Sequence, residues 1–172
     1  MNYTIENLSL ENSEEYARVN ALAWKESYKG IINEDYLNFI NTEEEIQKLI
    51  GKTIEGLNDD SVRSFVLRVD DKAVGIVRVG KSRIEDYPDY GELYSIYLLD
   101  SVKKQGYGKV LFEKAKAELK DMGYTKMING CIEGNKTNEF YQHMGGVFVY
   151  KTKLSIPNGQ IVDENIYCYK KI

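Results

Sequence analysis

The fold is decided by one stretch of the chain, Ile96-Tyr97-Leu98-Leu99-Asp100-Ser101-Val102-Lys103-Lys104-Gln105-Gly106-Tyr107-Gly108-Lys109. Its apolar start predicts a buried strand over residues 93–99. A short loop with two glycines follows and leads directly into a helix predicted over residues 108–122. The apolar residues that share one face of this helix are Leu111, Ala115, Leu119 and Met122.

The glycine loop has the features of an anion site. The first turn of a helix has backbone N–H groups without partners, and the helix dipole favours negative charge there. Gly106 and Gly108 allow a tight turn and the close approach of a phosphate. Lys103, Lys104 and Lys109 add positive charge at the same end. The loop therefore predicts a site for a pyrophosphate.

Two other phosphate loops fail on spacing. A P-loop needs a glycine five residues before Gly108 and a Ser or Thr after Lys109, but Lys103 and Val110 stand there. The dinucleotide fingerprint needs a third glycine where Leu111 stands. The two glycines alone are also compatible with an ordinary turn before a helix.

The rest of the chain alternates irregularly between strand and helix patterns. The predicted elements are a strand over 3–8, a helix from Ser13 to Gly30, one or two helices over 33–55, a hairpin of 65–69 and 74–79, a strand over 127–132, a short helix over 137–143, and an antiparallel pair over 147–154 and 161–170. This order favours a mixed sheet over a uniformly parallel one. No repeat, low-complexity tract or linker divides the chain, so a single domain over residues 1–172 is expected.

Composition excludes several classes of protein. The 172 residues carry a net charge of -4, so no basic excess is available to neutralise the phosphates of a nucleic acid. The opening residues do not show the pattern of a signal peptide, so none is expected, and no apolar run approaches the roughly 20 residues that cross a membrane. These features predict a cytoplasmic protein without nucleic-acid or membrane partners. Cys131 and Cys168 are expected to be reduced thiols, and no cysteine–histidine cluster suggests a metal.

A second motif follows at 134–146, Gly134-Asn135-Lys136-Thr137-Asn138-Glu139-Phe140-Tyr141-Gln142-His143-Met144-Gly145-Gly146. Asn135 is a natural N-cap for the short helix, and Gly145 is suited to ending it. Together with the loop at 103–108, this segment resembles the GCN5-related N-acetyltransferase (GNAT) family, whose motifs are Gln/Arg-x-x-Gly-x-Gly/Ala and Asn-x4-Phe-Tyr-x3-Gly-Gly. The first position of the loop departs from the family pattern, since it is Lys103.

The resemblance implies a fold and a cofactor. The implied fold is α/β (more narrowly α+β), a largely antiparallel twisted sheet of about seven strands flanked by helices and splayed between strands 4 and 5. The implied co-substrate is acetyl-CoA, and no metal is implied. Its pantetheine arm would pair with the main chain of Ile96, Tyr97 and Leu98. The other residues implied in cofactor binding are Lys103, Lys104, Gln105, Gly106, Tyr107, Gly108, Lys109, Asn135 and Tyr141.

The resemblance also implies a mechanism. Acetyl transfer would be direct, with the N–H of Leu98 polarising the thioester carbonyl and Tyr141 protonating the leaving thiolate. Glu92 is the candidate base, although a solvated glutamate at a strand end explains its position equally well. Trp24 and Tyr28 would wall the acceptor site, with Glu92 beside it, and core packing is an equal alternative for the two aromatic residues.

Two functions remain open. The first is an N-acetyltransferase that acts on a primary amine of a small molecule, polyamines included, or of a peptide. The alternative is a non-catalytic acyl-CoA-binding or sensory domain on the same fold. Dimers are common among relatives, so a homodimer is a further expectation.

Overall fold

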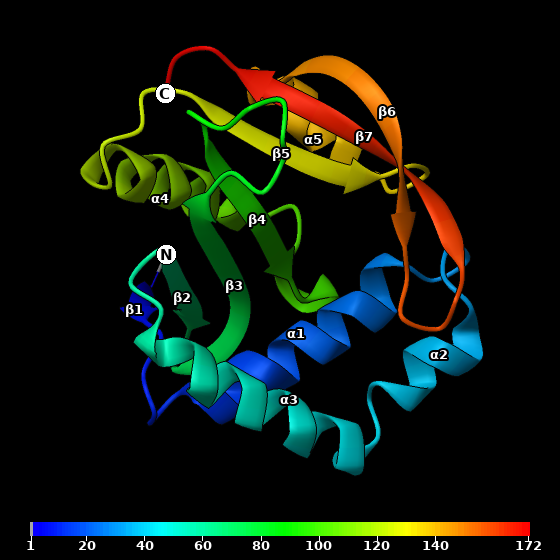
Figure 1. Ribbon diagram of the computed structural model, residues 1–172. Coiled ribbons are helices and arrows are strands. Elements are labelled where there is room, and N and C mark those ends of the chain that lie inside the picture. The colour runs from blue at the N-terminus through cyan, green and yellow to red at the C-terminus, as the bar shows by residue number, and fades with distance from the viewer. Residues whose placement is uncertain (1) are drawn as a thin grey trace.

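The computed structural model describes residues 2–172, and its centre is one seven-stranded sheet (Figure 1). The strand order is β1-β2-β3-β4-β5-β7-β6. The strands are β1 (Tyr3–Asn7), β2 (Val62–Val69), β3 (Lys72–Lys81), β4 (Gly91–Leu98), β5 (Met127–Ile132), β6 (Val147–Ser155) and β7 (Ile161–Tyr169). Only β4 and β5 are parallel neighbours. The predicted mixed, largely antiparallel sheet of seven strands is therefore confirmed.

Helices cover both faces of the sheet (Figure 1). The α-helices are α1 (Ser13–Ser27), α2 (Glu34–Phe39), α3 (Glu43–Glu55), α4 (Tyr107–Asp121) and α5 (Thr137–His143), and 3-10 turns lie at Gly56–Asn58 and Asp100–Val102. One or two helices were expected within residues 33–55, and the structure has two, α2 and α3. None of the helices within residues 2–172 is both long and apolar enough to cross a membrane.

The core follows from the alternation of side chains along the central strands. Phe65 and Leu67 of β2 pack in the cluster that α4 covers, whereas Val66 between them packs in the cluster that contains Tyr16 of α1. Since neighbouring residues of a strand point to opposite faces, both faces of β2 need apolar side chains. Phe65, Val66 and Leu67 are therefore all apolar because helices bury both faces of β2.

The sheet opens between β4 and β5. These strands pair only at Gly91 with Met127 and at Glu92 with Ile128, whereas β4 pairs with β3 as far as Leu98. Beyond Glu92, the strands diverge and leave one edge of β4 without a neighbouring strand. The splay predicted between strands 4 and 5 is confirmed, and it provides the space for the site described next.

Candidate functional site

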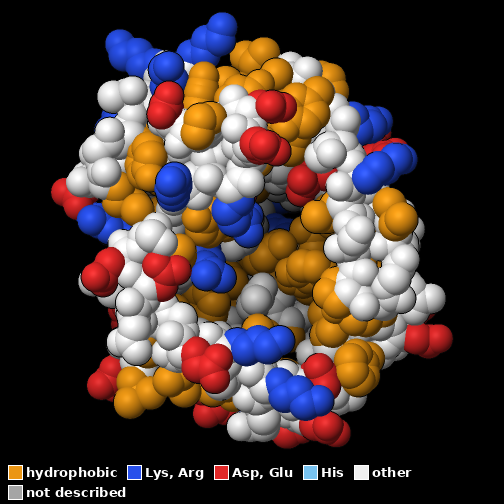
Figure 2. All heavy atoms as spheres, in the orientation of Figure 1, with side chains coloured by type: hydrophobic (Ala, Val, Ile, Leu, Met, Phe, Trp, Pro, Cys, Tyr) orange, Lys and Arg blue, Asp and Glu red, His pale blue; other side chains and the backbone are white. Residues whose placement is uncertain are grey.

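The gap between β4 and β5 forms a cleft of about 870 Å³. Its walls come from β4 and β5, the loop before α4, the C-terminal end of α1, helix α5, and the ends of β6 and β7 that approach it. Figure 2 shows the molecule hollowed near its centre, with hydrophobic side chains inside the hollow and Lys or Arg side chains on its rim. The cleft therefore combines an apolar interior with a basic edge.

Backbone N–H groups are available where α4 begins. Gly106 is the N-cap residue at φ 91°, a left-handed conformation that glycine adopts without steric cost. The first helical bond runs from the Val110 N–H to the Gly106 carbonyl at 3.3 Å. The N–H groups of residues 107–109 precede this bond, and no side chain caps them. These amides and the helix dipole make the loop able to hold an anion.

Positive side chains surround this helix end. Lys103, Lys104 and Lys109 all line the cleft. Lys103 is neutralised in part by Asp100, whose carboxylate lies 2.6 Å from the Lys103 ammonium. Neither Lys104 nor Lys109 forms an ion pair with an acidic residue in the described part of the chain. Two lysines are therefore free to neutralise a bound phosphate.

The open edge of β4 presents main-chain groups to the cleft. The Leu99 N–H donates to the Val74 carbonyl of β3 at 2.9 Å. Since alternate residues of an antiparallel strand direct their N–H and C=O groups to opposite edges, those of Leu98 and Ile96 face the gap. The main-chain groups of Tyr97 face β3 for the same reason, so Tyr97 reaches the cleft through its side chain.

Helix α5 places a phenol in the cleft. Tyr141 is 5% exposed and lines the cleft. The start of the helix is fixed by the Asn135 side chain, which accepts a hydrogen bond from the Thr137 N–H at 2.9 Å, and by Asn138, which accepts one from the Tyr167 hydroxyl at 2.8 Å. Burial raises the pKa of Tyr141 well above its ordinary value, so the hydroxyl keeps its proton at neutral pH and can donate it.

Aromatic side chains form the opposite end of the cleft. Trp24 of α1 and Tyr28, the residue that follows this helix, meet edge to face, with ring centroids 5.0 Å apart. The Tyr28 and Tyr97 hydroxyls lie 3.1 Å apart and share a hydrogen bond. Burial raises the pKa of Tyr97 to about 12, so these hydroxyls are neutral. This end offers aromatic faces and neutral hydroxyl groups to a ligand.

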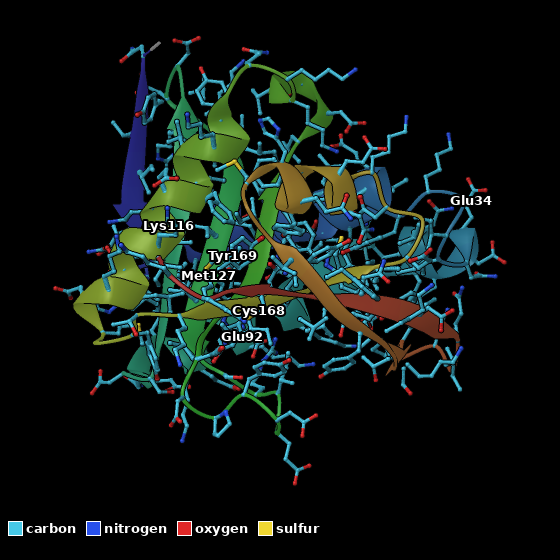
Figure 3. All side chains as sticks on the ribbon, turned by 90° about the horizontal axis from the view of Figure 1, so that it is seen from above. Glu34, Glu92, Lys116, Met127, Cys168 and Tyr169 are labelled. Carbon is cyan, nitrogen blue, oxygen red and sulfur yellow. The ribbon has the colours of Figure 1, made fainter. Side chains whose placement is uncertain are left out.

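Glu92 lies outside the cleft lining, at the point where β4 and β5 meet. Figure 3 shows it beside Met127 and Cys168, in agreement with the strand register. Its side chain is buried, and it accepts hydrogen bonds from the Arg83 N–H at 2.7 Å and the Arg83 guanidinium at 2.6 Å. The assignment of Glu92 as a base stays a prediction. In the structure, its carboxylate forms an ion pair with Arg83.

Two residues of the predicted anion loop turn their side chains away from the cleft. Tyr107 is 4% exposed, and its ring packs edge to face against Tyr3 at a centroid distance of 6.0 Å. Gln105 donates its side-chain amide to the Ser101 carbonyl at 3.2 Å. Both residues can therefore serve an anion only through their backbone.

Two residues that line the cleft were not among the site residues predicted from the sequence. Cys131 of β5 lines the cleft, and burial is the main cause that raises the pKa of its thiol to about 12. The thiol is therefore protonated and a poor nucleophile. Glu164 of β7 also lines the cleft. A solitary acid within a strand pattern gives little signal, because only the register of β7 against β5 brings this side chain to the gap.

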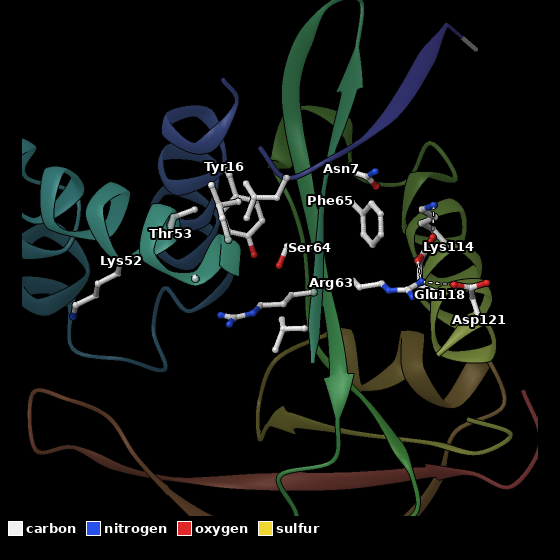
Figure 4. A pocket seen from close by; sticks show the side chains of 15 residues that line it. Asn7, Tyr16, Lys52, Thr53, Arg63, Ser64, Phe65, Lys114, Glu118 and Asp121 are labelled. Atoms are coloured by element: carbon white, nitrogen blue, oxygen red, sulfur yellow. Dashed lines mark hydrogen bonds and ion pairs between the residues drawn. The ribbon is translucent and has the colours of Figure 1, made fainter. Parts of the chain in front are cut away.

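A second hollow, of about 620 Å³, surrounds the end of β2 that β1 does not cover. In Figure 4, Tyr16 and Thr53 lie on one side of this strand, and Lys114 and Glu118 lie on the other. Arg63 bridges Glu118 and an aspartate of α4, with both contacts at 2.7 Å. The strand therefore divides the hollow, and many of its charged side chains already pair with each other.

Comparison with known proteins agrees with this geometry. The family described as "Acetyltransferase (GNAT) family" matches residues 16–146. The chain is 33% identical over 140 residues to the uncharacterized N-acetyltransferase YuaI of Bacillus subtilis (strain 168), covering 81% of this chain and 77% of that protein.

Solved structures share the fold at lower sequence identity. The PaiA N-acetyltransferase of Thermoplasma acidophilum, crystallised in complex with coenzyme A, aligns over 100% of both chains with a TM-score of 0.70 and 20% identity. An N-acetyltransferase of Staphylococcus aureus Mu50 aligns over 98% of both chains with a TM-score of 0.69 and 19% identity. The family match and the identity to YuaI together show that this chain belongs to the GNAT family of acetyltransferases.

Proposed function

We propose that this protein transfers the acetyl group of acetyl-CoA directly to a primary amine of a small molecule or a peptide. The observation that carries the proposal is the open edge of β4. There, main-chain N–H groups that no strand uses line the same cleft as the protonated phenol of Tyr141. Membership of the GNAT family and the coenzyme A complex of the Thermoplasma acidophilum relative support the choice of acyl donor.

The residues present fit coenzyme A. Its diphosphate needs N–H donors and positive charge, which the first turn of α4, Lys104 and Lys109 provide. Its amide-containing arm needs a partner for hydrogen bonds, and the groups of Ile96 and Leu98 that face the gap are suited to pair with it as an added strand would. When bound, acetyl-CoA supplies an activated acetyl group as a thioester.

Each side of the reaction has a group in place. The Leu98 N–H is suited to polarise a carbonyl oxygen, because it points into a gap from which β5 is absent. Tyr141 retains its proton and can pass it to a departing thiolate, so that no thiolate has to form in an apolar cleft. Cys131 is protonated, which favours direct transfer over an acyl-cysteine route.

The acceptor is expected to enter past Trp24 and Tyr28. Aromatic faces attract cationic groups, and the neutral hydroxyls of Tyr28 and Tyr97 can accept hydrogen bonds from an ammonium group. This end of the cleft therefore suits a primary amine that carries an apolar or aliphatic stem.

A thiol-release assay with acetyl-CoA over a panel of polyamines, aralkylamines and peptides tests the proposal. We expect turnover with at least one amine, and a fall of kcat by about 10² to 10³ in Tyr141→Phe with an unchanged Kd for acetyl-CoA. Binding of acetyl-CoA without turnover on any amine would instead support a sensory domain. An unchanged kcat in Tyr141→Phe would contradict the acid role.

A further inference from the structure

The carboxylate of Glu164 lies against the splayed part of β5. Glu164 pairs with Ile132 of β5 and with Thr152 of β6 in the sheet register. A Cβ atom built on Gly130 would lie 2.5 Å from the carboxyl carbon of Glu164 and 2.6 Å from one of its oxygens. The carboxyl group thus occupies the space that any other residue at position 130 would fill.

Gly130 belongs to the part of β5 that no longer pairs with β4. The last parallel pair is Glu92 with Ile128, two residues before Gly130. Both Gly130 and Glu164 line the cleft. The missing side chain at position 130 therefore lets an acid from the next strand reach across β5 to the wall of the gap.

The two carboxylates near the gap differ in their partners. Glu92 is buried and takes four hydrogen bonds from Arg83, one from its main chain and three from its guanidinium. Within residues 2–172, Glu164 forms no ion pair and no side-chain hydrogen bond. A proton acceptor needs free lone pairs, which Glu164 keeps and Glu92 has given to Arg83.

The surroundings of Glu164 also affect how readily its carboxylate accepts a proton. Burial is the main cause that raises the pKa of Glu164 above its ordinary value of 4.5, and the nearby negative charge of Glu92 adds to it. Arg83 opposes the shift. Burial is the main cause that raises the pKa of Cys131 of β5 and of Tyr150 of β6, and the charge of Glu164 contributes to both shifts.

We propose that Glu164, rather than Glu92, takes the proton from the acceptor ammonium, directly or through one water. The inference rests on the proposed amine acetylation and names its base. The ammonium gives one proton to the Glu164 carboxylate, which leaves a neutral amine with a free lone pair and a carboxylic acid. The acid then returns its proton to solvent. After the C–N bond forms, the C–S bond breaks and the departing thiolate takes one proton from Tyr141. The second proton of the nitrogen passes through solvent to the Tyr141 phenolate, so the net reaction releases one proton.

The pH dependence of kcat tests this role in the intact protein. We expect Glu164→Gln to lower kcat at pH 7 by about 10² to 10³. The rate of the variant should then rise about tenfold per pH unit as more acceptor becomes neutral, and approach that of the wild type near the amine pKa of about 10. Glu164→Asp should retain part of the activity. A variant that keeps wild-type kcat at pH 7 would overturn the proposal.

Two matched variants separate this role from a structural one. Glu133→Gln changes a neighbouring acid of similar charge that pairs with Lys151 on the surface, and it should leave the pH profile of kcat unchanged. Glu92→Gln should lower the melting temperature, because it removes the partner of Arg83, and it should retain the acidic limb of the profile. If Glu92→Gln instead abolished the acidic limb and Glu164→Gln retained it, the proposal would be wrong.

Gly130→Ala tests the geometry with the acid still present. The new methyl group must displace the carboxyl group, so we expect kcat to fall about tenfold or more at pH 7 while acetyl-CoA still binds. In a Glu164→Gln background, Gly130→Ala should have little further effect on kcat, because the displaced group is no longer a base. Additive losses in the double variant would contradict the proposal.

A spectroscopic titration distinguishes failure of this inference from failure of the proposed function. In protein labelled with ¹³C at the glutamate carboxyls, the resonance that Glu164→Gln removes should titrate above pH 4.5. This result requires no acceptor. A resonance that titrates at or below 4.5 would overturn the base role even in an active enzyme. Absence of turnover with every amine would instead reject the proposed function.

Discussion

The cleft between β4 and β5 and the hollow around the end of β2 differ less in size than in whether their polar groups have partners. The cleft between β4 and β5 measures about 870 Å³, and the hollow around the end of β2 measures about 620 Å³. In the hollow, Arg63 and Lys114 both contact Glu118, each at 2.6 to 2.7 Å. In the cleft, N–H groups, two lysines and a glutamate lack such partners among residues 2–172. The comparison shows that unused donors and acceptors mark a site better than volume does.

Two glutamates express this difference. Burial alone would raise the pKa of Glu118, but hydrogen bonds from Lys114 and Arg63 lower it below its ordinary value. Burial raises the pKa of Glu164, where no such bonds oppose it. Glu118 thus stabilises the fold as an anion. Glu164, with its raised pKa, accepts a proton more readily than Glu118 does.

The largest expected effect is on the open edge of β4. Leu98→Pro removes the N–H that faces the gap without removing a hydrogen bond to β3, so the fold should persist. We expect kcat to fall by about 10² to 10³, as for other oxyanion donors. Leu98→Ala controls for the lost side chain and should keep most of the activity. Equal losses of kcat in the two variants would assign the effect to packing and contradict the donor role.

A smaller effect is expected from the charge at the start of α4. Reversing Lys104 and Lys109 to Glu should raise the Kd for acetyl-CoA by about 30-fold to 100-fold at low salt, with a smaller change at high salt. Reversing Lys52 and Lys120 makes the same change of net charge elsewhere and should leave the Kd within about twofold. Isothermal titration calorimetry at two salt concentrations measures both. Similar losses in the two pairs would mean that only net charge matters.

The smallest expected effect is on stability. Glu118→Gln should lower the free energy of unfolding at pH 7 by about 1 kcal/mol. Because the pKa of Glu118 is lowered in the folded state, this contribution is present above pH 4.5 and is lost as the pH falls through the folded-state value. The pKa of Glu164 is raised, so stability falls as the pH rises from 4.5 through its folded-state value.

Glu164→Gln should therefore raise the melting temperature at pH 7, and the gain should disappear below pH 4.5. Thermal unfolding at several pH values measures the stability effects of both substitutions. The kcat of Glu118→Gln should equal that of the wild type. A loss of stability in Glu164→Gln at pH 7 would show that the carboxylate is paired in solution, and it would remove the contrast between the two hollows.

Most of the fold could be predicted from the sequence, because the spacing of apolar residues indicates each helix or strand and glycines indicate where many of them end. The strand over 127–132 and the helix over 137–143 were predicted to the residue, since polar residues or glycines bound each of them. The opening between β4 and β5 followed from the resemblance to the family, because no local pattern indicates where two distant strands stop pairing.

The orientation of single side chains was harder to predict. Tyr107 is the first residue of α4, and only the packing of this helix on the sheet turns its ring into the core. The contact of Glu164 with Gly130 joins residues that lie 34 positions apart in the chain. It depends on the register of β7 against β5, for which the sequence contains no signal. The partner of Glu92, by contrast, lies only nine residues away, but it depends on the path of the loop between β3 and β4.

The central claim is that the start of α4 holds the diphosphate of acetyl-CoA. Calorimetry of acetyl-CoA binding to the wild type, Gly106→Glu and Gly123→Glu tests it most directly. The two variants are matched because both glycines have a φ above +90°, and Gly106 precedes α4 whereas Gly123 follows it. We predict saturable heat with the wild type and Gly123→Glu, and at least a 100-fold weaker Kd with Gly106→Glu. No heat with folded wild type, or equal Kd values for the two variants, would contradict the account.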